Sequence, residues 1–309
     1  MTPTLSTNLR TFAAEDPGSW SSVIEFARAA DAAGIDRLTL SDHVVFGEDL
    51  EAYGDPAKGG MRGGTQPTGP DGVWLDPLTT IAHLTAVTSR VRFATNILIA
   101  ALRRPVVLAK VAATIDVLSG GRLDMGVGVG WQREEYVAAG LSYEHRGRLL
   151  NHTIEVCQAL WRDTAASYES PELTFSAIHQ MPKPVQPGGV PVWVSGTVNP
   201  RSMERLARYG SGWIPWGDDA ADLAGGITRM RQAVAGFGRD PKDLGVVGAL
   251  RSVRNEDRSL DVEKTMAGVP ALLEVGVTDV SLALSVPAGL EAATEYLGTV
   301  VAGFRSVSG

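Results

Sequence analysis

The sequence contains a single cysteine, Cys157, which excludes an intrachain disulfide and a cysteine-ligated metal cluster. Cys157 stands among the apolar positions of a helical stretch between Leu149 and Trp161, so we interpret it as a buried thiol, with a redox cysteine as the alternative. Long apolar runs are also missing, and the start MTPTLSTNLRT lacks a basic stretch followed by an apolar one. We therefore expect a cytoplasmic protein without a membrane segment.

Positive charge is scarce as well. The chain has 28 Lys and Arg against 35 Asp and Glu, a net charge of -7, and no basic run long enough to follow a phosphate backbone. Nucleic acid is consequently not an expected partner. Apolar residues make up 44% of the chain, which is enough for a sizeable core. At 309 residues the chain could form two average domains or one eightfold α/β barrel, which needs roughly 250 residues plus insertions.

Strand-like and helix-like segments alternate along almost the whole chain. Strands are predicted at 5–11, 37–43, 91–99, 122–130, 190–196, 212–217, 244–253 and 277–285. Helices are predicted at 20–33, from Asp76-Pro77 onward, and at 105–118, 134–161, 199–210, 219–235, 261–275 and 288–301. Eight such units predict an α/β fold of the (β/α)8 TIM-barrel class as one domain over 1–309, with an open doubly wound sheet as the competing architecture.

Two segments interrupt this alternation. Residues 44–72 are dense in Gly and Pro, so we expect a surface loop there, either a mobile lid or a connector without function. Residues 165–189 contain four prolines that disfavour a regular helix, and we expect a short hairpin.

The second predicted strand directs attention to His43. Alternation puts Leu38 and Leu40 on one side and Thr39, Ser41 and His43 on the other. Because the helix-facing side of a barrel strand must be apolar, the second set should point inward, with His43 at the mouth of the barrel. Active sites of TIM barrels lie at the C-terminal ends of the strands, so His43 is the candidate catalytic residue; a structural histidine is the alternative.

The fourth predicted strand, GRLDMGVGVGW at 121–131, alternates apolar side chains with Asp124 and glycines. The inward positions nearest the mouth, Gly128 and Gly130, have no side chains, which predicts space for another group such as a flat ring. The alternative is that neighbouring strands fill the gap with large side chains. The GVGVG run matches a dinucleotide-binding pattern only weakly, because the third glycine and the acidic ribose ligand are missing.

A third pattern is VSGTVNPRSMERLARYG at 194–210, a strand followed by a small-residue turn and a helix. The backbone N–H groups of Ser195, Gly196, Thr197 and the helix start could hold a phosphate, and ordinary helix capping is the alternative. The five histidines lack a ligand-like spacing, and no nucleophile elbow is present, so metal-dependent and nucleophilic hydrolysis are not expected. The remaining features suit an aromatic, phosphorylated cofactor that supplies the chemistry.

These motifs resemble one known family. SDHV at 41–44, TNILIAALRRPVVLAKVAATIDVLSGGRLDMGVGVGWQREEYVAAG at 95–140, and MPKPVQPGGVPVWVSGT followed by RYGSGWIPWG, up to 217, look like the luciferase-like monooxygenase superfamily. The resemblance is closest to the branch that uses the deazaflavin coenzyme F420. It implies a barrel with insertions, a homodimer formed through helices around units two to four, and a cofactor across the strand ends.

The resemblance also implies roles for single residues. It matches Asp42 and His43 to an Asp-His pair beside the reactive ring, and Asn96-Ile97 to a bulge with a non-proline cis peptide behind the ring. The cofactor-binding residues that we expect on this basis are Asp42, Thr95, Asn96, Ile97, Gly128, Gly130, Trp131, Glu135, Arg146, Ser195, Gly196 and Thr197. The chain departs from the family pattern at Ser195, where Gly is usual, and at Ser211, where Asp is usual, so a role carried by that Asp does not transfer.

The leading hypothesis is an F420-dependent oxidoreductase that transfers hydride between the deazaflavin and a small organic substrate. The alternative is an FMN-dependent monooxygenase that oxidises a small organic substrate with O2. A barrel that only binds a ligand, without redox activity, is a third possibility. The substrate depends on loops such as 44–72, whose conformation the sequence does not determine.

Overall fold

The computed structural model describes residues 2–58 and 60–309, so Met1 and Gly59, which the predicted domain and the predicted insertion include, lie outside the described residues. Eight parallel strands form a closed barrel, because β1 pairs with both β3 and β12. In barrel order the strands are β1 (Thr4–Asn8), β3 (Arg37–Leu40), β5 (Arg92–Thr95), β6 (Leu123–Val127), β9 (Val192–Gly196), β10 (Gly212–Pro215), β11 (Gly245–Ala249) and β12 (Asp279–Ser281). The chain therefore has the predicted (β/α)8 TIM-barrel fold, and the open sheet is excluded.

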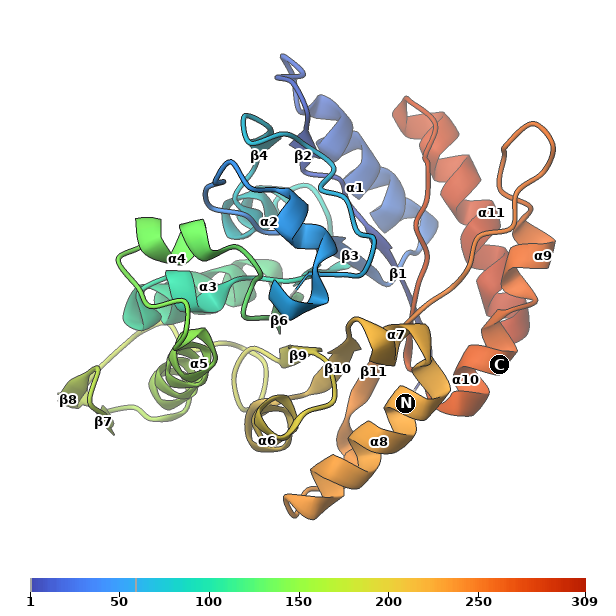
Figure 1. Ribbon diagram of the computed structural model, residues 1–309. Helices are drawn as coiled ribbons and strands as arrows, with labels where there is room; N and C mark the ends of the chain where they lie inside the picture. The colour runs from blue at the N-terminus through green and yellow to red at the C-terminus, as the bar shows by residue number, and fades with distance from the viewer. Residues whose placement is uncertain (1, 59) are drawn as a thin grey trace.

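Helices surround the barrel, as Figure 1 shows. They are α1 (Ser21–Ala33), α2 (Pro77–Thr85), α3 (Pro105–Ser119), α4 (Arg133–Ala138), α5 (Arg146–Arg162), α6 (Pro200–Tyr209), α7 (Asp218–Ala221), α8 (Leu223–Gly236), α9 (Val262–Met266), α10 (Val269–Val275) and α11 (Leu290–Ser308). Not one of these described helices combines the length and the apolar character that crossing a membrane requires.

Capping residues place several helix ends where the sequence predicts them. The Asp76 side chain accepts a hydrogen bond from Thr79 N at 2.8 Å and begins α2, with Pro77 in its first turn. Asn199 and Ser202 form a reciprocal capping box at the start of α6. At the other end of α3, Gly120 adopts a left-handed conformation with φ of 68°, which a glycine reaches without steric cost.

Other boundaries differ from the predictions. The helical region predicted at 134–161 consists of α4 and α5, separated by residues 139–145, and the regions at 219–235 and 261–275 are each two helices. In the last of these, Pro270 lies in the first turn of α10, where its missing N–H costs no helical hydrogen bond. The strands are shorter than predicted: β3 ends at Leu40 and β6 at Val127, so His43 and Gly128 lie in the loops that follow.

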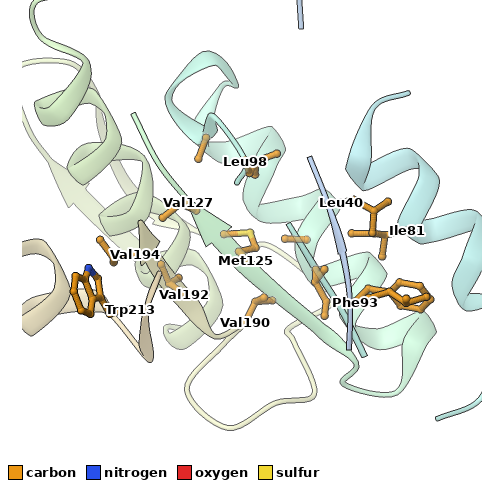
Figure 2. Close-up of a cluster of buried hydrophobic side chains, with 14 of the residues drawn as sticks. Leu40, Ile81, Phe93, Leu98, Met125, Val127, Val190, Val192, Val194 and Trp213 are labelled. Atoms are coloured by element: carbon orange, nitrogen blue, oxygen red, sulfur yellow. The ribbon is translucent and has the colours of Figure 1, made fainter. Parts of the chain in front are cut away.

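The main core lies between the strands and the helices. Leu40, Phe93, Met125, Val127 and Val192 are fully or almost fully buried there, and Figure 2 shows them together. The lone thiol of Cys157 is also buried and contacts Pro105 O, and burial raises its pKa. This agrees with the interpretation of a buried thiol, because such a group rarely forms the reactive thiolate.

Inside the barrel, the end away from the C-terminal edge is closed by charged side chains. Arg37 forms ion pairs with Asp124, at 3.1 Å, and with Asp279, and its guanidinium lies 4.7 Å from the centre of the Trp193 ring. Burial raises the pKa of Asp279, against the effect of Arg37. The inward side of β6 is therefore polar at Asp124, as the alternation predicts, and open space is concentrated toward the other end.

Both predicted insertions are present. Residues 165–189 contain the hairpin β7 (Ala166–Glu169) and β8 (Thr174–Ile178), which confirms that prediction. The described residues of 44–72 include two short 3-10 helices, η1 (Glu51–Gly54) and η2 (Pro56–Lys58), and the chain then enters β4 (Val73–Trp74). Strand β4 pairs with β2 (Phe12–Ala13), so this insertion returns to the N-terminal part of the chain.

Candidate active site

A cavity of about 330 Å³ lies at the C-terminal ends of the barrel strands. Nine of the residues expected at a cofactor site line it: Asp42, His43, Asn96, Ile97, Gly128, Gly130, Trp131, Ser195 and Gly196. The other lining residues are Phe12, Ser41, Tyr53, Gln66, Pro67, Trp74, Ile99, Val129 and Trp216. The barrel thus brings together side chains that are up to about 200 positions apart in the sequence, at the edge where TIM barrels carry function.

The His43 imidazole lies in an aromatic environment within this cavity. Its ring centre is 4.5 Å from that of Phe46 and 4.9 Å from that of Trp74. Nδ1 is 3.4 Å from Glu135 Oε1, and Nε2 is 3.5 Å from Gln66 Nε2. With the proton on Nδ1 facing the carboxylate, Nε2 would accept the amide hydrogen of Gln66, so the Nε2 side can exchange a proton with a bound molecule.

Glu135 lies behind His43 and does not line the cavity. Its side chain is fully buried in α4 and accepts a hydrogen bond from Val44 N at 2.8 Å, while its Oε2 atom has no partner among the described residues. The Glu135 carboxyl group thus lies beside His43 Nδ1 and also binds the backbone of the next residue, Val44. This position suits a residue that positions the imidazole.

Asp42, although it lines the cavity, uses its carboxylate for structure. Arg103 donates to both carboxylate oxygens, at 2.7 and 2.9 Å, and Ile99 N donates to Oδ2 at 2.9 Å. Arg103 also donates to Asp76 at 2.8 Å. Burial opposes the charge of Arg103, but its two carboxylate partners raise the pKa of the guanidinium. Asp42 thus connects the loop after β3 with the loop after β5, and this connection fixes the backbone that carries His43.

The glycines after β6 make room for protein side chains, so the structure supports the alternative explanation for them. A Cβ on Gly128 would lie 2.8 Å from Cδ1 of Ile97, and a Cβ on Gly130 would lie 3.2 Å from Cδ1 of Ile99. Side chains from the loop after β5 therefore fill the space that we expected a ring to fill. Gly128 and Gly130 still line the cavity, but a ring would rest against Ile97 rather than replace a missing side chain.

The backbone after β5 contains the expected non-proline cis peptide, between Asn96 and Ile97. Both residues line the cavity. Thr95, which ends β5, does not: its side chain is buried in the barrel and donates to Gly126 O at 2.7 Å. Thr95 contributes to the site only by linking β5 to β6.

The expected phosphate cradle after β9 is only partly available. Ser195 and Gly196 line the cavity. At the helix start, however, Ser202 N donates to the Asn199 side chain at 3.0 Å and Val198 N donates to Asp219 at 2.7 Å. Ordinary capping therefore accounts for the helix end, as the alternative proposed. Thr197 lies outside the lining, and its hydroxyl accepts a hydrogen bond from Asn199.

Arg146, at the start of α5, also lies outside the lining. Its guanidinium is 3.9 Å from the centre of the Tyr143 ring and donates to Tyr143 O at 3.0 Å. The Tyr143 hydroxyl oxygen lies 2.8 Å from both Trp131 O and Lys58 O, so its single hydrogen is donated to one of them or shared. Arg146 and Tyr143 thus support the loop that carries Trp131.

Five lining residues that the sequence reasoning did not select are Phe12, Tyr53, Gln66, Trp74 and Trp216. Trp216 directly follows β10, so the rule that pointed to His43 could have found it. The other four lie on β2, β4 and the insertion 44–72, where no strand periodicity applies. Phe12 and Trp74 stack with ring centres 4.2 Å apart, and Tyr53 lies 5.5 Å from Trp131.

The cavity consequently has two walls. The strand-end wall is made of His43, Ile97, Gly128 and Gly130, which follow β3, β5 and β6, and of Ser195 and Gly196, which end β9. The loop wall is made of Phe12, Tyr53, Gln66, Pro67 and Trp74. Among the described residues, Gln66 Oε1 and Trp131 Nε1 are buried without a hydrogen-bond partner, and His43 Nδ1 has only the Glu135 carboxyl group near it. An apolar cavity with a few unpartnered polar atoms is typical of sites that bind a largely aromatic molecule.

Comparison with known sequences identifies the family of this chain. Residues 5–271 match the family described as luciferase-like monooxygenase. The chain belongs to the luciferase-like monooxygenase family. An uncharacterized protein of Mycobacterium tuberculosis is 34% identical over 206 residues, which cover 67% of this chain and 68% of that protein.

Solved structures similar to this luciferase-like protein include an F420-dependent dehydrogenase and a monooxygenase. An F420-dependent secondary alcohol dehydrogenase in complex with an F420-acetone adduct matches with a TM-score of 0.75 and 16% identity, over 99% of this chain and 100% of that one. The monooxygenase RslO1 of Streptomyces bottropensis matches with a TM-score of 0.74 and 18% identity, over 98% and 99%. At these identities the likeness concerns the fold. Membership of the luciferase-like family shows that the chain belongs to a group of oxidoreductases and monooxygenases.

Proposed function

We propose that this protein is an F420-dependent oxidoreductase that transfers hydride between the deazaflavin and a small organic substrate, with the whole chain acting as one domain. The observation that carries the proposal is the position of His43, which follows Asp42 after the end of β3 and lines a cavity together with Asn96 and Ile97. When bound, the deazaflavin would supply the hydride, which the protein's own side chains lack.

The chain's residues would hold and serve that cofactor in defined ways. Ile97 would support one face of the ring, while Gly128, Gly130 and Trp131 would contact its edge. Ser195 and Gly196 would offer backbone N–H groups to a phosphate. His43, oriented by Glu135, would hold or release a proton at Nε2, and the surrounding aromatic side chains would exclude water.

Titration with oxidised F420, followed by the fluorescence of the coenzyme, tests the proposal without an activity assay. We expect saturable binding at micromolar concentration, and weaker binding by at least tenfold in Gly128→Val, whose side chain would collide with Ile97. Absence of binding to the wild type at micromolar coenzyme would refute the proposal.

The alternative function is an FMN-dependent monooxygenase, which the similarity to the monooxygenase RslO1 favours. The two proposals differ in their requirement for O2. Uptake of O2 that depends on both substrate and reduced FMN, without turnover of reduced F420, would support the monooxygenase. Turnover of F420 under anaerobic conditions would support the oxidoreductase.

We also propose that the protein is a homodimer formed through α3. Val107 and Leu118 are 60% and 68% exposed, and Val111 on the same face is 37% exposed. Apolar side chains at this spacing form a stripe along the helix that water solvates poorly. Sedimentation should give a dimer for the wild type and a monomer for Val107→Asp/Val111→Asp, while a monomeric wild type would contradict the proposal.

A further inference from the structure

The loop wall differs in chemistry from the strand-end wall and is the part of the cavity that the family resemblance did not assign. It comes from β2, from β4 and from the insertion 44–72. Trp74 and Gln66 place this wall beside His43, so it faces a molecule that occupies the cavity next to that imidazole and to a cofactor ring. This inference rests on the proposed function, because it concerns the reaction partner of that ring.

Fixed charge is scarce around the cavity. Among the lining residues that the structure describes there is no Lys or Arg, and the ionisable ones are Asp42, His43 and Tyr53. The Asp42 carboxylate is neutralised by Arg103. Burial raises the pKa of Tyr53, so its phenol remains protonated at neutral pH. A charged substrate would lose its hydration here, and the lining residues offer it no unpaired ion apart from His43, so its burial is costly.

Three of the five loop-wall residues, Phe12, Tyr53 and Trp74, are aromatic. The Phe12 and Trp74 rings are nearly parallel, with an interplanar angle of 18°, and the Trp74 ring meets His43 edge-on at 84°. On the other side Tyr53 lies 6.5 Å from Trp216. Such surfaces bind apolar bodies, and they also bind quaternary ammonium groups. A cation would lie beside the imidazole, which is repulsive whenever His43 is protonated, so the neutral ligand is favoured.

Polar recognition is concentrated at one point of this apolar surface. Gln66 Nε2 is 3.5 Å from His43 Nε2, a distance at the limit for a hydrogen bond, so a bound oxygen could replace this weak contact. Gln66 Oε1 and Trp131 Nε1 are buried and unpartnered among the described residues. A carbonyl oxygen placed beside His43 Nε2 would accept a hydrogen bond from Gln66 Nε2 that is stronger than the present contact, and a hydroxyl there could also donate to the unpartnered Gln66 Oε1.

We propose that Gln66 and the aromatic rings of the loop wall form the substrate site, and that they select an uncharged molecule with an apolar ring-sized body and one carbonyl or hydroxyl oxygen. In the reducing direction reduced deazaflavin, when bound, would supply the hydride to the carbonyl carbon, and His43, protonated at Nε2, would give a proton to the carbonyl oxygen. The product would be the alcohol, the deazaflavin would be left oxidised, and solvent would return a proton to His43 Nε2. Oxidation of the alcohol reverses each transfer.

A matched set of ring compounds tests this selectivity: cyclohexanone, cyclohexanecarboxylate and cyclohexyltrimethylammonium share a ring and differ in charge. Binding is followed by quenching of tryptophan fluorescence, since Trp74, Trp131 and Trp216 line the cavity. The titrations are made with and without saturating oxidised cofactor. We expect cyclohexanone to bind at least tenfold more tightly than either ion, and part of the quenching to disappear in Trp74→Phe.

Gln66→Ala and Gln66→Leu should each weaken cyclohexanone binding about tenfold, the loss of one good hydrogen bond to a buried oxygen. The matched control is Gln232→Ala, an exposed glutamine on α8, which should leave binding unchanged. Equal or tighter binding of the carboxylate or the ammonium compound would overturn the proposal, as would unchanged binding in both Gln66 variants.

The same variants separate this proposal from the proposed function. Gln66→Ala should bind oxidised F420 as the wild type does, because Gln66 lies on the loop wall. Binding of F420 without selectivity for the neutral ring would overturn the substrate class alone. Selective binding of the neutral ring by a protein that binds neither F420 nor FMN would overturn the proposed function and leave the substrate class supported.

Discussion

The two walls of the cavity are held in place by different means. The residues of the strand-end wall follow β3, β5 and β6 or end β9, and the parallel pairing of the barrel fixes the positions of these strands. The loop wall is held by separate contacts, such as Gly47 N with Gln132, Tyr143 with Lys58 O, and the two-residue pairing of β2 with β4. The strand-end wall is held by the barrel, which suits residues that take part in chemistry. The loop wall is held by separate contacts, so its sequence can change with the substrate.

The largest expected effect is on the strand-end wall, at His43. His43→Ala should lower the turnover number by about 10² to 10⁴, the range for loss of a general acid or base, while F420 binds nearly as before. Loop-wall variants should mainly raise KM for the substrate instead. Stopped-flow reduction or oxidation of the coenzyme measures the step directly.

His83→Ala is the matched control, because His83 is exposed on α2 away from the cavity. It should retain full turnover. If His43→Ala kept the wild-type rate, the chemistry would not depend on the strand-end wall, and the distinction between the walls would fail.

The two walls also differ in how well sequence reasoning predicts them. Alternation along the second predicted strand led to His43, and the rule for barrel strand ends led to Ser195 and Gly196. Both inferences were possible because the barrel determines on which side of a strand a residue lies and how far along the barrel axis it lies. Gln66 and Tyr53 gave no comparable signal, since their positions depend on long-range contacts with His43 and Trp131. The glycines after β6 were found, but for the wrong reason, because the side chains they accommodate come from another strand's loop.

The next largest effect should follow removal of Arg103, which links the loop after β3 to the start of α2. Arg103→Met leaves the buried Asp42 carboxylate with only Ile99 N as a partner. We expect a loss of about 3 kcal/mol in the free energy of unfolding, the lower end for breaking a buried ion pair, because Arg103 retains 18% exposure. Urea denaturation of the wild type and the variant measures this loss in the free energy of unfolding.

The neighbouring residue supplies the control, since Arg104 is exposed and makes no side-chain cap at α3. Arg104→Met should change the free energy of unfolding by less than about 0.5 kcal/mol. The double variant Asp42→Asn/Arg103→Met should be more stable than the sum of the single losses predicts. An additive result would mean that the two side chains do not act as a pair.

A smaller effect is expected from filling the gap between the loops after β5 and β6. Gly128→Ala places a Cβ against Ile97 and should cost about 1 to 3 kcal/mol, the usual range for overpacking. Gly126→Ala should cost more, because its Cβ would meet the backbone oxygen of Thr95, which cannot rotate away. Thermal unfolding of the two variants gives the comparison.

Ile97→Ala identifies the cause of the Gly128→Ala effect. Combined with Gly128→Ala, it should recover part of the lost stability, since the colliding side chain is removed. Equal losses in the presence and absence of Ile97 would show that this packing does not explain the glycine.

The smallest expected effect concerns Asp76, where the segment after the loop wall enters α2. Burial alone would raise the pKa of Asp76, but the N–H of Thr79 and the Arg103 guanidinium outweigh it and hold the pKa below its usual value. The folded state therefore binds this proton less readily than the unfolded state. The stabilisation is complete above the unfolded pKa of about 3.9 and is lost as the pH falls below it.

Asp76→Asn keeps the capping oxygen and removes the charge, so it should lower the free energy of unfolding at pH 7 by less than about 1 kcal/mol. Urea unfolding across this pH range should show the difference between wild type and variant shrinking toward zero on acidification; a difference that grows would assign the stabilisation to another carboxylate.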